Sequence, residues 1–285
     1  MSKKVVFLIL HFNSIEVTRE CIESIKNLDQ QDRIEIVIVD NASPNGSGKK
    51  LKEEYMQDKN VHVRLNTENA GFSKGNNYGY EYIKSNIDVQ YLIVANNDIV
   101  FKQVDFLKKL DQEYQKSNFD ILGPDVWNTC MEVHQNPLDT AVRTKKEVEK
   151  TIRFHQIALK FFDVAYPLLC IAEKRSSKKR YHQSNDNYRF YQEGVCLMGA
   201  CLVFSEQYIL EKDKIFCPET YFYYEEYILT LQALREKRKI VYTPDIVVDH
   251  REGSATGSIS SKNKIKKKFM MKNMLDSAKI YRDLL

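Results

Sequence analysis

The 285-residue sequence lacks the features that mark several large protein classes. Its six cysteines form no CxxC pair and show no zinc-type spacing, so the common zinc motifs are absent. No apolar run approaches the roughly 20 residues that a membrane-spanning helix needs. The apolar run at residues 5–10 is too short for the core of a secretory signal. We therefore expect a reduced, cytoplasmic protein that does not span a membrane.

The sequence also lacks a strong overall charge, with a net value of +4, and its 43% hydrophobic residues are typical of a globular protein. Residues 143–180 carry eleven Lys or Arg against four acids, and residues 262–282 carry eight against one, so each segment has a local charge of +7. These segments suggest a surface that meets an anionic partner such as a membrane face. A solvated helix face explains either segment alone equally well. We expect no nucleic acid, because aromatic residues do not alternate with the basic ones.

The first hundred residues alternate between short apolar runs and helical patterns. Strands are predicted at residues 5–10, 34–39, 61–65 and 91–95, with helices between them. This alternation is typical of βαβ units and predicts an α/β fold with a mostly parallel sheet flanked by helices. We expect one domain over residues 1–261, in which residues 1–100 hold a nucleotide and residues 101–261 hold the second substrate. A basic amphipathic helix would follow over residues 262–285.

The second half is less regular. A continuous apolar run predicts a strand over residues 195–204, with Gly199 where another backbone approaches closely. Residues 240–248 predict a further strand, placed at the sheet edge because it contains Pro244. Earlier in the chain, the Gly- and Asn-rich residues 69–77 predict a loop that leads into a helix.

Polar side chains follow two of the predicted strands, at the sheet edge where ligands bind in α/β proteins. Asp40 can accept a hydrogen bond from a base or ribose, although capping of the next turn is an equal alternative. Asn96, Asn97 and Asp98 follow a buried strand, where unpartnered polar groups would be costly. A Mg²⁺ or Mn²⁺ ion would satisfy them, although one carboxylate is present where two are more usual. A structural Asp98 that caps the next turn is the alternative.

Two further segments carry candidate chemistry. Residues 69–77 place glycines and amides ahead of a helix, as a phosphate or sugar cradle does, but they match neither a Walker loop nor GxGxxG. Glu225 and Glu226 begin a helix directly after four aromatic residues. The helix dipole alone favours acids there, but partial desolvation by aromatic rings would raise their pKa toward that of a general base. His250 ends a strand, and such a lone histidine is more often structural.

Taken in order, six motifs resemble glycosyltransferase family 2, and most of all its rhamnosyltransferase-type branch of bacterial surface polysaccharide enzymes. They occupy residues 39–44, 69–77, 94–98, 199–204, 222–226 and 250–254. The resemblance covers roughly residues 4–256. It implies a GT-A fold, a nucleotide-sugar donor, a divalent metal ion (Mn²⁺ or Mg²⁺) and inversion at the anomeric carbon.

The resemblance also implies roles for single residues. Asp40 would contact the nucleoside, Asp98 and His250 would hold the metal, and Glu226, beside Glu225, would deprotonate the acceptor. The remaining expected site residues are Asn41, Asn69, Gly71, Lys74, Asn77 and Asn97 toward the donor, and Gly199, Tyr223 and Tyr224 toward the acceptor. The family's metal motif has lost its first acid, and its usual Glu-Asp pair is Glu-Glu. The longer base is displaced by about 1 Å, which the backbone absorbs or which costs about 100-fold in activity.

The expected reaction transfers a sugar from dTDP-rhamnose or a UDP-hexose to a lipid-linked saccharide, in capsule, exopolysaccharide or cell-wall synthesis. The basic segments would hold the enzyme at the inner face of the membrane, with Phe269, Met270, Met271 and Met274 on an interfacial helix. Alternatively, these apolar residues dock on the domain or on a second subunit of a homodimer. A non-catalytic relative that binds nucleotide sugars, with Glu226 as the lesion, is the alternative from another functional class.

Overall fold

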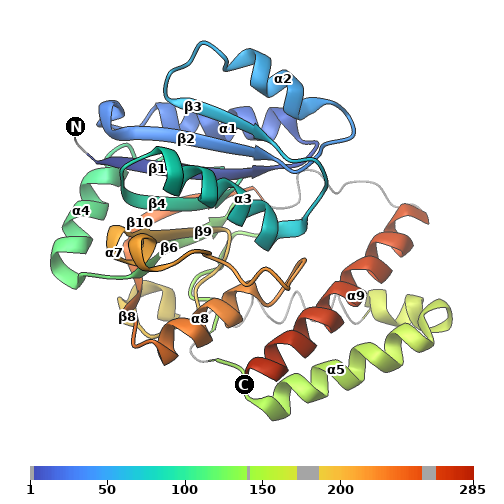
Figure 1. Cartoon of the computed structure of the whole chain (residues 1–285). Coiled ribbons are helices and arrows are strands. Elements are labelled where there is room, and N and C mark those ends of the chain that lie inside the picture. The colour runs from blue at the N-terminus through green and yellow to red at the C-terminus, as the bar shows by residue number, and fades with distance from the viewer. Residues whose placement is uncertain (1–2, 140–141, 172–185, 252–260) are drawn as a thin grey trace.

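The computed structural model describes residues 3–139, 142–171, 186–251 and 261–285. The ten strands in these ranges form one sheet in the order β3-β2-β1-β4-β9-β6-β10-β5, with β7 beside β6 and β8 beside β10 (Figure 1). The strands are β1 (Lys4–His11), β2 (Ile34–Asp40), β3 (Val61–Leu65), β4 (Val89–Asn96), β5 (Ile99–Val100), β6 (Ile121–Asn128), β7 (Val133–His134), β8 (Gln192–Glu193), β9 (Cys201–Ser205) and β10 (Ile240–His250). The helices are α1 (Ile15–Lys26), α2 (Ser47–Glu54), α3 (Gly71–Asn86), α4 (Phe106–Ser117), α5 (Lys145–Lys160), α7 (Glu206–Glu211), α8 (Glu225–Arg235) and α9 (Ser261–Leu284). A helical segment over residues 162–171 follows α5.

The direction of the strands decides where the site can form. Strands β1, β2, β3 and β4 are parallel, as predicted. Strand β9 is antiparallel to both β4 and β6, and β10 is parallel to β6. As a result β6 and β10 run in the same direction as β1 and β4. The carboxyl ends of β1, β2, β4, β6 and β10 therefore share one edge of a mixed sheet, and the predicted α/β fold is confirmed.

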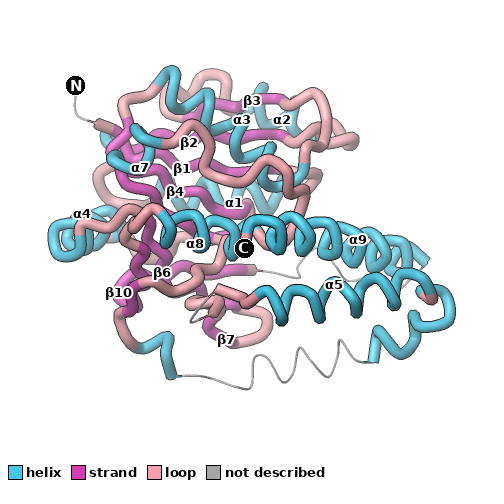
Figure 2. The backbone as a smooth tube through the Cα atoms, turned by 60° about the horizontal axis from the view of Figure 1, so that its bottom comes forward, coloured by secondary structure: helices cyan, strands magenta, loops and turns pink. Residues whose placement is uncertain are grey.

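Helices cover both faces of this sheet because its strands are apolar on both sides (Figures 1 and 2). Along β1, Val5, Phe7 and Ile9 pack in a core with α1, α2 and α4. Val6 and Leu8 point to the other face and pack in a second core with α3, α7 and α8. This alternation follows from the two-residue period of a strand. Each fully buried side chain of this kind contributes about 1.5–3 kcal/mol to stability.

Three predictions about secondary structure were wrong. Residues 69–77 do not form a loop, because α3 already begins at Gly71. The predicted strand over residues 195–204 is reduced to β9, since the residues before Cys201 leave the sheet. Pro244 does not mark an edge strand. Strand β10 has partners on both sides, and Pro244 lies at a register irregularity between Thr243 and Val247, where the ladder is interrupted.

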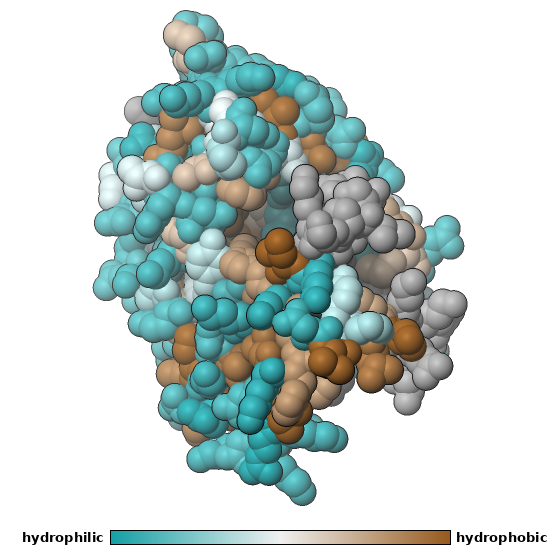
Figure 3. All heavy atoms as spheres, turned by 90° about the vertical axis from the view of Figure 1, so that its right-hand side faces the viewer, coloured by the Kyte–Doolittle hydropathy of each residue, from teal (hydrophilic) through white to brown (hydrophobic). Residues whose placement is uncertain are grey.

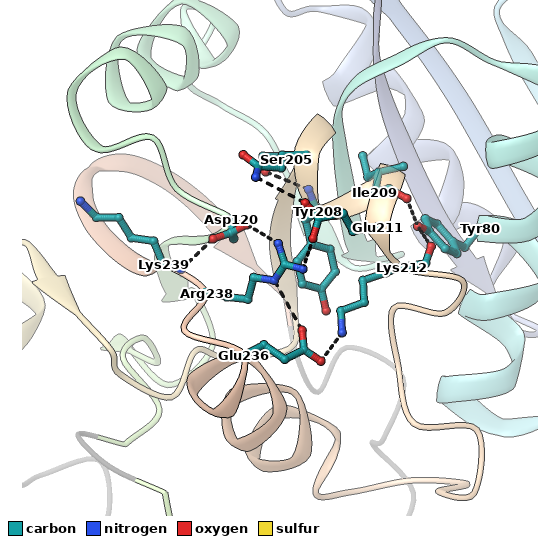
Figure 4. Close-up of polar contacts among 11 residues, drawn as sticks. Tyr80, Asp120, Ser205, Tyr208, Ile209, Glu211, Lys212, Glu236, Arg238 and Lys239 are labelled. Carbon is teal, nitrogen blue, oxygen red and sulfur yellow. Dashed lines mark hydrogen bonds and ion pairs between the residues drawn. The ribbon is translucent and has the colours of Figure 1, made fainter.

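A cluster of ion pairs lies at the amino edge of the sheet, opposite the shared carboxyl ends (Figure 4). Arg238 forms ion pairs with Asp120, Glu211 and Glu236. Asp120 also accepts a hydrogen bond from the Lys239 backbone N–H at 2.8 Å. The cluster thereby fixes the chain just before β6 and β10 begin.

The C-terminal helix packs on the protein. Helix α9 lies beside α5 in Figures 1 and 2, and its Leu275, Ala278 and Tyr281 are buried in a core that includes Val148 and Ile152 of α5. Met271 is buried and Met274 is partly buried. The expectation that these two methionines belong to an interfacial surface was therefore wrong, whereas Phe269 and Met270 are exposed. Across the described ranges, every helix is too short or too polar to cross a bilayer.

Candidate active site

A cleft of about 1320 Å³ opens at the carboxyl edge of the sheet. In the first half of the chain, its lining residues lie at the ends of β1, β2 and β4, around the start of α3, and at residues 138 and 139. In the second half they come from residues 198–200, residues 221–227, α5 and α9. The predicted site residues that line it are Asn41, Asn69, Asn97, Gly199, Tyr223, Tyr224, Glu225 and Glu226.

Asn41 holds the turn before α3 in place. Its amide nitrogen donates to Asn69 Oδ1 and to the Gly71 carbonyl, each at 3.0 Å, and its Oδ1 accepts from the Ala70 N–H at 3.1 Å. Gly71 has a φ of +77°, and a Cβ there would lie 2.4 Å from the Tyr221 carbonyl oxygen. Only glycine therefore fits at this crossing of two chain segments.

Residues 221–224, the aromatic loop, connect this turn to the second half of the cleft. Tyr221 donates its hydroxyl to Asn69 Oδ1 at 3.0 Å, and its carbonyl accepts from the Phe72 N–H at 2.8 Å. On the other side, Ser277 of α9 donates to the Phe222 carbonyl at 2.7 Å. The aromatic loop is thus tied both to α3 and to the C-terminal helix.

The aromatic loop carries backbone strain. Tyr223 and Tyr224 have φ angles of +73° and +67°, a left-handed conformation that costs about 1–2 kcal/mol per non-glycine residue. The Tyr224 ring is buried with its centroid 5.5 Å from that of Tyr281. This packing holds the loop in its strained form. Tyr224 therefore acts mainly in the core, while Tyr223 is partly exposed at the cleft.

Glu225 and Glu226 follow the aromatic loop as a pair of desolvated acids. Burial raises the pKa of both carboxyl groups, and for Glu225 the neighbouring charge of Glu226 raises it further. Glu226 is the more accessible of the two, while Glu225 is buried and its Oε1 has no hydrogen-bond partner among the described residues. Neighbouring acids of this kind titrate as a unit, and the unit is a proton acceptor with a raised pKa.

Gly199 and Arg143 line the cleft together with Glu226. Gly199 leaves room for the Glu226 carboxyl group, because a Cβ on Gly199 would lie only 2.8 Å from Glu226 Oε1. The Arg143 charge favours the ionised form of Glu226. Arg143 is fixed 4.5 Å from the ring centroid of Tyr227 and has no carboxylate partner among the described residues. Gly199 was expected at the acceptor, and the three atoms that a Cβ there would approach most closely all belong to the predicted base.

The other predicted chemistry concerns Asp98 and His250. Asp98 Oδ1 and His250 Nε2 lie 3.2 Å apart, and each is buried without a hydrogen-bond partner in the described part of the chain. On the far side of the ring, His250 Nδ1 donates to Gln135 Oε1 at 2.6 Å. The other ring nitrogen, Nε2, therefore faces a carboxylate oxygen.

A carboxylate oxygen and an imidazole nitrogen at this separation can both bind one divalent cation. Ligands at 90° around a metal with bonds of about 2.1 Å lie about 3.0 Å apart, close to the observed separation. The described residues contain no group of three His, Cys, Asp or Glu side chains that could hold a metal. Asp98 and His250 would therefore supply two ligands and leave the remaining positions to a substrate or water, as is usual for Mg²⁺ and Mn²⁺ sites with nucleotides.

Several predicted donor residues are occupied elsewhere. Asp40 accepts hydrogen bonds from Ser43, as expected for the alternative in which it caps the turn. Asn77 bonds the backbone of Phe216 through both its amide atoms. Lys74 and Asn77 line a separate hollow and not the cleft. Two expected segments lie partly outside the described residues. These parts are residues 252–254 of the last motif and residues 172–180 of the first basic segment.

Phe12, Gln135 and Arg143 are among the residues at the site that were not predicted. Phe12 directly follows β1, so the rule that identified Asp40 and Asp98 at strand ends could have found it. Gln135 and Arg143 carry no local signal. They reach the site only because β7 lies beside β6 and because α5 lies beside α9.

The sequence matches the family model described as Glycosyl transferase family 2 over residues 7–194. The chain belongs to glycosyltransferase family 2. A curated relative, glycosyltransferase GlyG of Streptococcus pneumoniae serotype 4, is 26% identical over 128 residues, which are 45% of this chain and 40% of that protein. The chain thus matches less than half the length of this relative.

Solved structures share the fold of this family 2 member at low identity. S. aureus TarS 1-349 in complex with UDP-GlcNAc has a TM-score of 0.54 and 15% identity, over 95% of this chain and 66% of that one. The mannosyltransferase PcManGT from Pyrobaculum calidifontis, in complex with GDP-Man and Mn²⁺, has a TM-score of 0.56 and 10% identity, over 98% and 74%. These likenesses confirm the predicted GT-A fold. The rhamnosyltransferase branch stays a prediction.

Proposed function

We propose that the protein is an inverting, metal-dependent glycosyltransferase that moves a sugar from a nucleotide-diphosphate donor to a saccharide acceptor. The donor is dTDP-rhamnose or a UDP-hexose. The observation that carries the proposal is the coexistence of two pairs at one sheet edge. One is the desolvated acid pair Glu225 and Glu226. The other is Asp98 and His250, whose facing Oδ1 and Nε2 atoms have no hydrogen-bond partner among the described residues. The nucleotide sugars bound by TarS and PcManGT support a donor of this class.

In this mechanism Glu226 removes the proton from an acceptor hydroxyl, which attacks the anomeric carbon from the face opposite the leaving group. Gly199 leaves space for the Glu226 carboxylate, and the charge of Arg143 favours its ionised form. Asp98 and His250 would hold the Mn²⁺ or Mg²⁺ ion, which neutralises the charge that develops on the departing nucleoside diphosphate. A single base suffices, because inversion needs no covalent enzyme intermediate.

For the donor, contact is best supported at the cleft-lining amides. Asn97 has its amide group 2.9 Å from Thr18 Oγ1, and the same hydroxyl group is bonded to the buried His11 at 2.7 Å. This network fixes the strand end beside Asp98. Asn41, Asn69 and Gly71 shape the neighbouring turn, whereas Lys74 and Asn77 receive little support from their position.

We also propose a lipid-linked acceptor for capsule, exopolysaccharide or cell-wall synthesis, used at the inner face of the membrane. The basic described residues of α5 and α9 support contact with an anionic surface. Tyr223 supports acceptor binding, because a partly exposed ring at the cleft can stack on a sugar face.

The test is metal-dependent release of nucleotide from a panel of UDP-, dTDP- and GDP-sugars. We expect Glu226→Gln to lower turnover about 1000-fold with donor affinity retained, and Asp98→Asn to lower both turnover and metal affinity. Glu236→Gln, at the opposite sheet edge, is the matched control and should leave turnover unchanged. Tight donor binding without release, even with lipid-linked acceptors present, would instead support the non-catalytic alternative.

A further inference from the structure

Two helical regions beside the cleft expose an unusual number of large apolar side chains. We define the helical arm as α5, residues 161–171 and residues 264–272 of α9. Nine of the eighteen exposed large apolar side chains in the described ranges belong to this arm, although it is a small part of the chain. They are Phe154, Ile157, Phe161, Val164, Leu168, Ile171, Ile265, Phe269 and Met270.

These side chains form a second apolar face and are not the edge of the core. In the segment over residues 162–171, Val164 and Leu168 are 84% and 70% exposed. Phe162, in contrast, is buried against Met271 of α9, with Leu169 packed beside it. The exposed residues recur every three or four positions, as one side of a helix requires. We call the side with Phe162 and Leu169 the inner face and the side with the nine exposed residues the outer face. Folding of the chain buries the inner face. At the cleft end of the outer face, Phe269 contacts the rings of Tyr221 and Phe222, and the rest stays exposed in the described structure, as at an interaction site.

Lysines are concentrated beside the outer face. Residues 264–272 contain Lys264, Lys266, Lys267, Lys268 and Lys272 and no acid. The acids of the arm lie on its other helices, and one of them, Asp163, is paired with Lys264 at 2.8 Å. Exposed apolar side chains next to a cluster of lysines are typical of helices that lie in a membrane interface, where the lysines reach anionic headgroups.

The outer face continues into the cleft. Phe154 of α5 and Phe269 of α9 are 54% and 49% exposed, and both also line the cleft. Figure 3 shows the end of the molecule where α5 and α9 lie, with brown apolar groups exposed among teal polar ones. A surface that binds the arm therefore lies next to the cleft.

We propose that the outer face of the helical arm inserts into the interfacial layer of an anionic bilayer and turns the cleft toward lipid-linked acceptors. This inference rests on the proposed function for the identity of the acceptor only. A second copy of the chain is a poorer occupant, because a two-fold contact places the same lysines against each other. An anionic lipid surface complements both the lysines and the apolar side chains.

The test is co-sedimentation of the full chain with vesicles of phosphatidylcholine alone or with 30% phosphatidylglycerol, about 30% being a typical working fraction for an anionic surface. We expect binding only to the anionic vesicles. The double substitution Val164→Ser and Leu168→Ser should weaken binding at least about tenfold. Leu210→Ser removes an apolar side chain of equal exposure, 69%, from α7 and should leave binding unchanged.

The charge requirement is tested separately with Lys266→Glu and Lys272→Glu, and with Lys49→Glu and Lys50→Glu on α2 as matched controls. Each lysine of the arm should contribute about fivefold to binding, and the α2 lysines should contribute nothing. Thermal unfolding checks that every variant is folded. Equal binding by the arm variants and their controls, or a concentration-dependent dimer that the Val164 and Leu168 substitutions abolish, would overturn the proposal.

Vesicle binding needs no donor and no turnover, and nucleotide release with a soluble acceptor needs no vesicle. A failure of vesicle binding therefore does not count against glycosyl transfer, and a failure of nucleotide release does not count against membrane binding. If both hold, the arm variants should lose turnover with a lipid-linked acceptor in anionic vesicles while they retain it with a soluble acceptor.

Discussion

The two edges of the sheet differ in how completely their polar groups are paired. At the amino edge, Arg238 is shared among three carboxylates and Asp120 also binds a backbone N–H (Figure 4). At the carboxyl edge, Asp98 Oδ1, His250 Nε2 and Glu225 Oε1 are buried with no hydrogen-bond partner in the described ranges. Both edges are built from strands of the same apolar character.

This difference separates stability from function. Unpartnered buried polar atoms cost about 1–3 kcal/mol each, and the strained Tyr223 and Tyr224 add to that cost. Such features persist only where the surrounding packing holds them, and they are concentrated at functional sites. The amino edge supplies part of that stability, while the carboxyl edge keeps groups available for a ligand.

The largest effect at the carboxyl edge, short of removing the base itself, is expected from Gly199→Ala. The new Cβ would lie 2.8 Å from Glu226 Oε1 and displace the base, which should lower kcat about 100-fold with little change in donor affinity. Gly194→Ala is the control: φ there is +71°, so stability should fall, but the added Cβ meets nothing closer than 3.9 Å and kcat per folded molecule should not change. Equal kcat for Gly199→Ala and wild type would remove Gly199 from the positioning of the base.

The next effect concerns the orientation of His250. Gln135→Leu removes the acceptor for His250 Nδ1 and should weaken Mn²⁺ binding about tenfold or more, measured by titration calorimetry in the absence of donor. Gln135→Glu keeps an acceptor oxygen at this position and should retain most of the affinity. An unchanged Mn²⁺ affinity in Gln135→Leu would contradict a role for Gln135 in holding the ring.

At the amino edge, the expected change is in stability alone. Arg238→Met breaks three ion pairs of a largely buried side chain and should lower the free energy of unfolding by about 1–2 kcal/mol. Turnover at saturating donor should stay at the wild-type value, as measured on the folded protein below its melting temperature. A large loss of kcat would show that the two edges are coupled more tightly than their contacts indicate.

The smallest effect is a pH dependence of stability. Burial raises the pKa of Glu225 in the folded protein above the unfolded value of about 4.3. The folded protein then keeps a proton that the unfolded chain releases, so the free energy of unfolding falls as pH rises above that value. Glu225→Gln removes this loss. Between pH 5 and 8 the stability of Glu225→Gln should therefore improve relative to wild type by at least about 1 kcal/mol.

Glu236→Gln is the control for this pH series. Ion pairing with Lys212 lowers the pKa of Glu236, so its carboxylate is ionised in both folded and unfolded states above pH 5. Its substitution should change stability by the same amount at pH 5 and pH 8. If the free energy of unfolding of Glu225→Gln followed the same pH dependence as that of wild type, Glu225 would not be desolvated as described.

Much of the fold could be predicted because its signals are local. The β1, β2, β3 and β4 runs are short, β-branched and separated by helical patterns, and each forms a strand. The Pro244 prediction failed for a physical reason: a register irregularity beside β6 accommodates a residue without an N–H in an interior strand. The loop prediction for residues 69–77 failed because Asn41 and Tyr221 stabilise a turn that lets α3 begin at Gly71.

The site, too, has features that the sequence predicts and features that depend on tertiary packing. The sequence by itself determined the α/β class, the strand ends that carry Asp98 and His250, and the acids that begin α8, since each follows from periodicity, strand polarity or family motifs. Only the tertiary structure decided that Gly199 and Arg143 act on Glu226, that Gln135 orients His250, and that Met271 is buried while Val164 and Leu168 are exposed. The reason is that strand ends and helix starts are fixed by neighbouring residues. Which side chains meet across the cleft, and which face of a helix stays open, depends on how distant segments pack.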